Sequence, residues 1–232
     1  MSRVSAVTLD AAGTLIHVRH PVGETYASIA AHRGIPVQAQ DIAAAFRTVF
    51  PRMAPLAFGA CQPQQLARQE RDWWRTLVRN CLGRHGQHPA FNAFFDELYA
   101  YYHGAAAWAV YPEVIEVLDA LEARGIAAAV VSNFDSRLHA VLRELGLHDR
   151  FRTVLCSSEA GAAKPDARIF AAACLALRSR PQQTLHAGDD RRADLQGARA
   201  AGLMAIWICR DQQRHIPDAD CASDLHGVIS CL

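Results

Sequence analysis

Lysine is almost absent from this sequence. Of its 24 basic residues only Lys164 is a lysine, and the others are arginines. The two cations are not interchangeable at tight sites, because guanidinium is a broad planar fork and ammonium is a compact point charge. Lys164 stands with Pro165 and Asp166 directly before a helical pattern. A composition that otherwise avoids lysine therefore indicates that a compact cation is needed at this position.

An excess of charge of one sign and long apolar runs are missing too. The formal net charge is only +1, whereas nucleic acids and anionic membranes attract strongly charged basic surfaces. No apolar stretch approaches the roughly 18 residues that a membrane span requires, and no basic-then-apolar leader precedes the first predicted strand. We expect a soluble, cytoplasmic protein with neither nucleic acid nor membrane as a partner.

Cysteine motifs are also lacking. The seven cysteines are odd in number and show no Cys-x-x-Cys or zinc-finger spacing. The simplest expectation is that all seven are reduced thiols.

The apolar pattern predicts an α/β protein with an insert. A strand over residues 4–9 is followed by no further convincing strand until residue 126, and from there strands and helices alternate. Such alternation predicts a Rossmann-like parallel sheet with helices on both faces. We assign residues 1–17 and 109–232 to this core and residues 18–108 to a helical cap domain.

The insert is too long for a structureless loop. Its periodicity predicts four helices, at residues 22–33, 39–50, 64–82 and 91–102. Most of the aromatic residues of the chain lie between Tyr26 and Trp108, which indicates a separate apolar core.

Asp10 is the first candidate for chemistry. It ends the first predicted strand and is followed by a turn with Gly13 and Thr14. A carboxylate at the carboxyl end of such a strand lies in the crevice where open α/β sheets bind ligands. It could act as a nucleophile or as a metal ligand, although an ordinary turn would use the same residues.

Ser132 and Asn133 end the next predicted strand in a similar way. A hydroxyl at this place could bind a phosphoryl oxygen. The alternative is a cap for the helix predicted after it.

A third strand end carries Asp189 and Asp190, with Asp194 one helical turn later. Three neighbouring carboxylates repel one another unless a cation holds them, and hard oxygen ligands suit Mg²⁺. A helix cap and a helix-dipole partner would explain one or two of these acids but not all three.

Taken in this order, the segments around Asp10, Ser132, Lys164 and Asp189 resemble the four motifs of the haloacid dehalogenase superfamily, over nearly the whole chain. Residues 19–26, 132–135 and 164–170 are most similar to the subfamily of the rhythmically expressed gene 2 product. The resemblance implies a Rossmann-like core, a cap, Mg²⁺, a covalent aspartyl intermediate and a small anionic, phosphorylated substrate.

The resemblance also implies a role for each motif residue. Asp10 would be the nucleophile, and Lys164 would steady it and the phosphoryl oxygens. The implied phosphate ligands are Thr14, Ser132 and Asn133. The implied metal site consists of Asp10, the backbone carbonyl of Ala12 and Asp189, supported by Asp190 or Asp194.

Ala12 departs from the pattern, because phosphatases of the superfamily carry a second aspartate there. That aspartate protonates the leaving alcohol and later activates water. Such acid-base catalysis is worth roughly 10²–10⁴ in rate, about 3–5 kcal/mol of barrier. Hydrolysis of ordinary alkyl phosphates should therefore be slow unless another group, such as His17 or His20, substitutes. The favoured alternative is that these two histidines are simple flap and linker residues.

Other reactions of the superfamily can be ranked against these residues. The phosphonate-cleaving enzymes need a cap lysine, and no lysine remains once Lys164 is assigned to the core. The 2-haloacid dehalogenases also lack the second aspartate, but their fourth motif is not a metal site. A phosphatase-like hydrolase is favoured. The alternatives are a protein that binds phosphorylated ligands without turnover and a dehalogenase-type hydrolase. The oligomeric state is left open.

Overall fold

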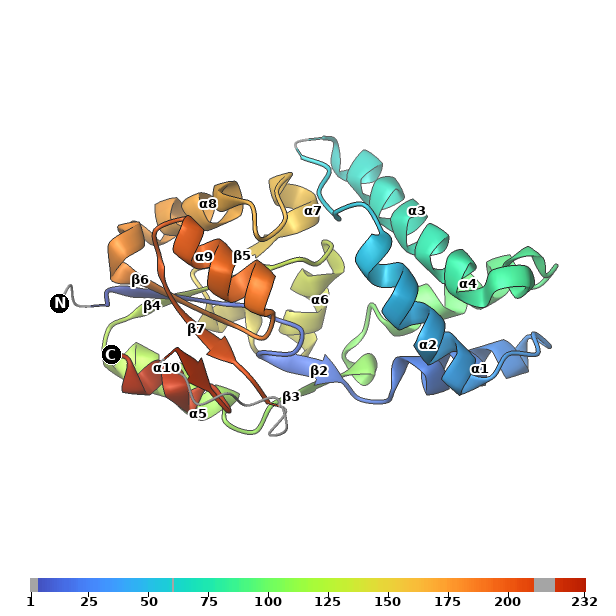
Figure 1. The fold of residues 1–232 in the computed structure, drawn as a ribbon, viewed down its shortest axis with the longest axis horizontal. Coiled ribbons are helices and arrows are strands. Elements are labelled where there is room, and N and C mark those ends of the chain that lie inside the picture. Colours follow the sequence, from blue (N-terminus) through green and yellow to red (C-terminus); the bar gives the residue numbers. More distant parts are fainter. Residues whose placement is uncertain (1–3, 60, 211–219) are drawn as a thin grey trace. The chain divides into compact units, whose positions relative to one another are not determined.

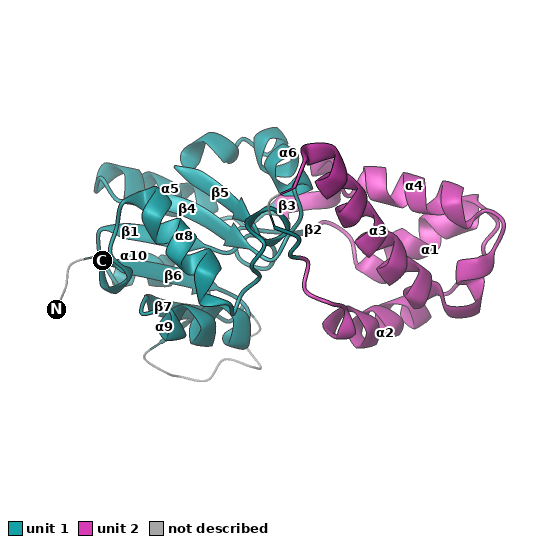
Figure 2. Ribbon diagram, turned by 90° about the horizontal axis from the view of Figure 1, so that it is seen from above, with its two compact units in different colours: residues 1–17, 57–60, 110–232 teal, residues 18–56, 61–109 magenta. Residues whose placement is uncertain are grey.

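The computed structural model describes residues 4–59, 61–210 and 220–232, and the chain forms two compact units (Figure 2). The first unit comprises residues 1–17, 57–60 and 110–232, and the second comprises residues 18–56 and 61–109. The short segment 57–60, expected as part of the cap, thus groups with the first unit. The backbone N–H of Phe58 donates to the carbonyl of Ser158 at 3.2 Å, which ties this segment to it.

A six-stranded parallel sheet forms the centre of the first unit, in the order β5-β4-β1-β6-β7-β8. Its strands are β1 (Ala6–Leu9), β4 (Ala127–Ser132), β5 (Thr153–Cys156), β6 (Thr184–Gly188), β7 (Met204–Ile208) and β8 (Cys221–Ala222). Leu9 at the end of β1 pairs with Val130 on one side and Ala187 on the other. The parallel α/β core predicted from the sequence is confirmed.

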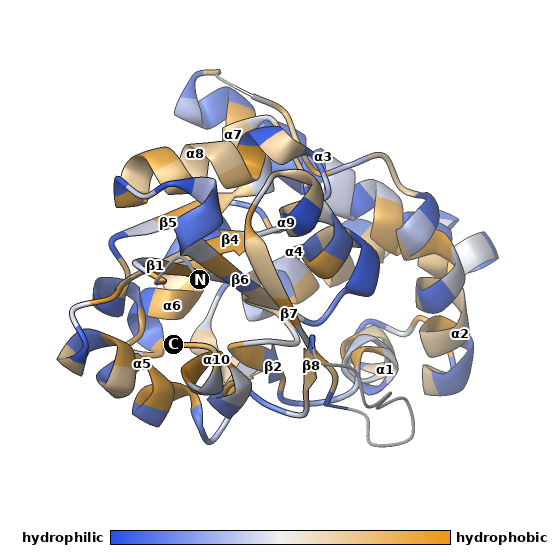
Figure 3. Ribbon diagram, turned by 60° about the vertical axis from the view of Figure 1, so that its left-hand side comes forward, coloured by the Kyte–Doolittle hydropathy of each residue, from blue (hydrophilic) through white to orange (hydrophobic). Residues whose placement is uncertain are grey.

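Helices cover both faces of this sheet (Figure 1). The helices of the first unit are α5 (Val114–Ala123), α6 (Arg137–Glu144), α7 (Ser157–Ala160), α8 (Ala167–Leu177), α9 (Gly197–Ala200) and α10 (His226–Ser230). Strands buried on both faces read as continuous apolar runs, and every residue of β1 is buried. Figure 3 shows β7 mostly in hydrophobic colours, whereas α5 alternates between apolar and polar residues, as a helix with one exposed side does.

The second unit contains four α-helices, α1 (Val22–His32), α2 (Ala39–Val49), α3 (Pro63–Leu82) and α4 (Phe91–Tyr101). They begin and end within one residue of the predicted positions. Their buried faces meet in a core that includes Tyr26, Ile42, Phe94, Phe95 and Leu98. This is the separate aromatic core that the composition of the insert indicated.

Two details differ from the sequence prediction. β2 (Ile16–Val18) and β3 (Trp108–Val110) pair in a two-stranded sheet, and three-residue strands are too short to give a periodic signal. The helix that follows the third strand end, expected from the strand-helix alternation, begins instead as a π-helical turn, Arg191–Gln196, and continues as α9. Such turns occur frequently at functional sites.

The structure also describes the cysteines and the lengths of the helices. All seven cysteines are thiols. Within the described ranges, none of the helices is both long and apolar enough to span a bilayer.

The packing of the second unit's core predicts how much stability is lost when a buried side chain is removed. Phe94 is fully buried, so Phe94→Ala should lower the free energy of unfolding by about 3–5 kcal/mol through lost burial and an unfilled cavity. Phe50→Ala is the matched control, because Phe50 is 42% exposed and should lose much less. Denaturant titration measures both variants, and equal losses would contradict the packing described here.

Candidate active site

The candidate catalytic side chains lie where three adjacent parallel strands end. Asp10 follows β1, Ser132 is the last residue of β4, and Asp189 follows β6. Because these strands are neighbours in the sheet, their carboxyl ends meet at one edge, the edge where open α/β sheets bind ligands. Asp10 and Ser132 are buried, and Asp189 is exposed at the rim.

Lys164 joins two buried carboxylates. Its Nζ lies 2.7 Å from Oδ1 of Asp10 and 2.5 Å from Oδ1 of Asp194. The hydroxyl of Ser132 donates to the same Oδ1 of Asp10 at 3.0 Å. In the part of the chain that the structure describes, the side-chain hydrogen bonds of Asp10 all end on Oδ1, which leaves Oδ2 for a reacting group.

Asn133 positions Lys164. Its side-chain amide donates to the Lys164 carbonyl at 2.9 Å, and its Oδ1 accepts from the Lys164 backbone N–H at 2.7 Å. Both ends of the amide are therefore engaged by the lysine backbone. The sequence placed Asn133 among the phosphate ligands, whereas this geometry makes it the residue that fixes the lysine loop to the end of β4.

His186 is a site residue that the sequence analysis missed. Its Nε2 lies 3.0 Å from Oδ1 of Asp194, and its Nδ1 lies 2.9 Å from Oγ1 of Thr8. The ring is fully buried and meets the edge of Phe170 at 5.1 Å between centroids. A histidine inside an otherwise apolar strand was the available signal. His186 and Lys164 thus contact the same oxygen of Asp194 and fix the carboxylate together.

The charged groups Asp10, Lys164 and Asp194 shift one another's pKa values. Burial alone would raise the pKa of Asp194, but the Lys164 charge and the His186 hydrogen bond outweigh burial and hold it well below its usual range. Burial alone would lower the pKa of Lys164, but the charges of Asp10 and Asp194 raise it. Burial raises the pKa of Asp10 against the opposing charge of Lys164. A further cation beside Asp10 would favour its ionised form.

Asp10, Asp189 and Asp194 form a cluster whose carboxylate oxygens lie within 4.8 Å of one another. Although Asp189 as a residue is exposed, partial loss of water around its carboxylate, followed by the charges of Asp10 and Asp194, raises the pKa of Asp189. Three carboxylates face one ammonium here, so the cluster would carry excess negative charge with all three ionised, and the raised pKa values of Asp10 and Asp189 reflect loss of water first and this repulsion second. Oxygen donors of this kind fit a hard divalent cation such as Mg²⁺.

Asp190 lies outside this cluster, although the sequence included it among the supporting metal residues. Its Oδ1 accepts from the backbone N–H groups of Arg192 at 2.8 Å and Ala193 at 2.7 Å, which is an N-cap. Asp194 takes the supporting place instead, and its Oδ2 accepts from the Asp190 N–H at 2.9 Å.

Two glycines allow the acids to come this close. A Cβ on Gly13 would lie 2.2 Å from Oδ2 of Asp189, and one on Gly188 would lie 2.2 Å from Cγ of Asp194. Gly13 also has a φ of +94°, in the left-handed region that favours glycine. The glycines of the first and fourth motifs therefore serve the site by making space.

Arg210 holds the turn after Asp10, and nothing in the sequence pointed to it. Its guanidinium donates to the carbonyl of Thr14 at 2.6 Å and to that of Gly13 at 3.1 Å, and it pairs with Glu113 at 2.7 Å. It also lies over the Tyr111 ring, 3.4 Å from the centroid.

The remaining predicted residues occupy distinct environments. Thr14 is fully buried, and its hydroxyl has no hydrogen-bond partner among the described residues, so its role as a phosphate ligand stays a prediction. Ala12 is half-buried and brings no titratable group to the turn. His17 packs on the Tyr111 ring at 4.6 Å between centroids, and His20 is exposed.

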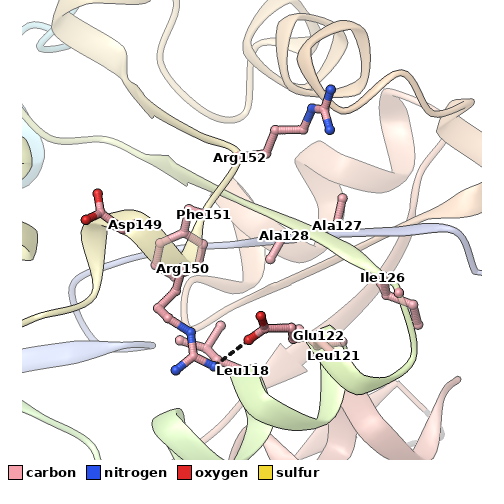
Figure 4. Close-up of a pocket in the computed structure, with 11 residues that line it drawn as sticks. Leu118, Leu121, Glu122, Ile126, Ala127, Ala128, Asp149, Arg150, Phe151 and Arg152 are labelled. Atoms are coloured by element: carbon pink, nitrogen blue, oxygen red, sulfur yellow. Dashed lines mark hydrogen bonds and ion pairs between the residues drawn. The ribbon is translucent and has the colours of Figure 1, made fainter.

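A cavity of about 430 Å³ lies at the opposite end of the sheet (Figure 4). Ala127 and Ala128, at the start of β4, line it together with residues that precede β5. Its Arg150 already pairs with Asp119 and Glu122 of α5. We therefore place the active site at the Asp10 edge and assign no ligand to this cavity.

Comparison with known proteins shows which family this sequence belongs to. The family model described as haloacid dehalogenase-like hydrolase matches residues 4–202, which includes all the motif residues. The chain belongs to the haloacid dehalogenase-like hydrolase family. The resemblance drawn from the motifs is thereby confirmed, and the protein is a hydrolase.

Three similar proteins align with between about half and nearly all of this chain. Haloacid dehalogenase-like hydrolase domain-containing protein 3 of Bos taurus is 33% identical over 210 residues, 87% of this chain and 80% of that protein. The phosphoserine phosphatase of Thermus thermophilus is 34% identical over 121 residues, 52% of this chain and 49% of that protein. Among solved structures, a HAD phosphatase from Thermococcus onnurineus has a TM-score of 0.68 at 21% identity, covering 98% of this chain and 97% of its own.

The buried ion pairs predict the effect of removing Lys164. Lys164→Met would leave Asp10 and Asp194 buried without their cation, and breaking a buried pair in this way costs about 3–5 kcal/mol. Denaturant titration measures this loss. The control is Arg168→Met, which removes a cation from the exposed pair with Asp166 and should change stability by less than about 0.5 kcal/mol.

A double variant separates this charge effect from lost packing. Asp194→Asn combined with Lys164→Met should be less destabilised than the two single losses added together, because fewer buried charges are left unpaired. Strict additivity would contradict the coupling between these residues.

Proposed function

We propose that this hydrolase acts on a small phosphorylated metabolite, depends on Mg²⁺, and proceeds through phosphorylated Asp10. One observation carries the proposal. The Asp10 carboxylate is fixed at Oδ1 by Ser132 and Lys164, inside an acidic cluster at the ligand-binding edge of the sheet. Carboxylates held in this way serve as nucleophiles in aspartyl-phosphate chemistry.

The residues present fit the metal that this chemistry uses. Asp10, the Ala12 carbonyl and Asp189 would hold Mg²⁺, with Asp194 supporting them, because the oxygens of Asp194 are already engaged by Lys164, His186 and Asp190 N–H. A bound Mg²⁺ neutralises charge on the transferred phosphoryl group. The excess of carboxylate over ammonium in the cluster supports this assignment.

Each protein group has a task in the proposed reaction. Oδ2 of Asp10 attacks phosphorus, and the bond from phosphorus to the leaving oxygen of the substrate breaks. Lys164 balances the negative charge of Asp10 and of the phosphoryl oxygens. Water then attacks the phosphorylated Asp10, which releases phosphate and restores the carboxylate.

Ala12 limits this reaction. Its methyl group cannot protonate the leaving oxygen, so that proton must come from water or from another group, and good leaving groups should react best. The phosphatase relative from Thermus thermophilus supports phosphoryl transfer, although it matches half of the chain. The insert carries more arginine than acid, which supports an anionic substrate.

The proposal is tested with p-nitrophenyl phosphate, an activated aryl phosphate that needs little leaving-group protonation. Wild-type protein should release nitrophenol only when Mg²⁺ is present, and chelation should stop the reaction. Asp10→Asn should abolish turnover, because an amide is a poor nucleophile. Asp41→Asn, the same chemical change at an exposed acid, should retain it.

Other outcomes identify the alternatives. Metal-independent halide release from a 2-haloacid would replace the phosphatase proposal with dehalogenation. Mg²⁺-dependent binding of a phosphate mimic without turnover of any phosphate ester would indicate a site that binds phosphate but has lost catalysis.

Position 12 gives a second test. Ala12→Asp would supply the missing acid-base group and should raise kcat for a phosphate ester with a poor leaving group by roughly 10²–10⁴. The gain should be much smaller for p-nitrophenyl phosphate. No gain on either substrate, in a variant that still binds Mg²⁺, would count against the proposed mechanism.

A further inference from the structure

A second cluster of metal-binding side chains lies outside the acidic cluster. Its members are His139 of α6, Cys156 at the end of β5 and Glu159 of α7. One ligand atom from each lies within 4.8 Å of the other two. All three residues belong to the first unit, so their mutual placement is that of a single compact body.

The donor atoms of this cluster are one nitrogen, one sulfur and one oxygen. This set differs from the all-oxygen set around Asp10 and suits Zn²⁺ or a similar transition metal rather than Mg²⁺. Ligand atoms around tetrahedral zinc lie about 3.5 Å apart, given zinc-ligand bonds of about 2.0–2.3 Å. The contact between His139 Nε2 and Glu159 Oε2, at 2.9 Å, is shorter than this separation, so a zinc ion would open it slightly, and the exposed side chain of Glu159 can move to allow that.

The outer contacts of His139 orient its ring as those of a metal ligand do. Its Nδ1 lies 3.4 Å from Nε2 of His148, whose Nδ1 lies 3.2 Å from the carboxylate of Asp149. The carboxylate can only accept, so Nδ1 of His148 donates to it and Nε2 accepts from His139. With a metal bound, this arrangement would keep the proton of His139 on Nδ1 and direct the lone pair of Nε2 toward the cluster, and such second contacts typically fix metal-binding histidines.

The contact inside the cluster holds a proton that a metal ion could replace. Nε2 of His139 lies 2.9 Å from Oε2 of Glu159. An imidazole lone pair and a carboxylate repel at that distance unless a proton or a metal ion lies between them. A metal bound there would take the place of this proton and of the thiol proton of Cys156.

We propose that His139 Nε2, Cys156 Sγ and the Glu159 carboxylate bind one zinc ion, with the fourth position open to water. The site would join α6, β5 and α7. Cys156 is fully buried and pairs in register with Ser132, whose hydroxyl bonds Asp10, so the metal would brace the strand end beside the active site. This proposal is independent of the proposed phosphatase activity.

The test is a titration of metal-free protein with Co²⁺, which takes zinc sites and reports thiolate ligation by a charge-transfer band in the near ultraviolet. The wild type should show this band at one equivalent, and Zn²⁺ should abolish it by displacement. The band should persist in Asp10→Asn and Asp189→Asn, which disable the acidic cluster only.

Three variants make the assignment falsifiable. Cys156→Ser should lose the band, while Cys174→Ser, which alters another buried thiol of the first unit, should keep it. Glu159→Gln changes an exposed side chain, so it should fold normally and weaken Co²⁺ affinity by roughly 10- to 100-fold. Absence of the band in wild type, its persistence in Cys156→Ser, or unchanged affinity in Glu159→Gln would overturn the proposal.

Discussion

The ammonium of Lys164, shared between Asp10 and Asp194, is the interaction on which the active site depends. Three groups that would each be costly to bury alone become stable together, because the cation compensates both carboxylates at short distance. The surrounding residues serve this arrangement. Asn133 fixes the lysine backbone and His186 fixes Asp194. The site is therefore organised before any ligand arrives.

The parallel sheet makes this arrangement possible. Segments more than 100 residues apart in sequence become neighbours because β4, β1 and β6 are adjacent and end at the same edge. Insertion of the second unit between β1 and β4 adds a body with its own core without disturbing the sheet. The residues of the acidic cluster and the lysine that balances it all belong to the first unit.

The same edge of the sheet presents two kinds of donor set. Around Asp10 the donors are carboxylate oxygens balanced by an ammonium, which suits phosphoryl chemistry with a hard cation. One strand farther out, at the end of β5, histidine, cysteine and glutamate offer nitrogen, sulfur and oxygen. This difference in donor softness would favour different metals at the two proposed sites. At Ala12 the first set lacks the proton donor that a fast phosphatase would have.

The sequence by itself determined the parallel α/β core, the helical insert and the positions of Asp10, Lys164 and Asp189, because apolar periodicity and residues at strand ends are local properties of the chain. Only the tertiary structure decided which acids share a cation. It assigned Asp190 to a helix cap and Asn133 to the lysine loop, and it revealed His186 and Arg210. These roles depend on distances between side chains on separate elements, which no local pattern encodes.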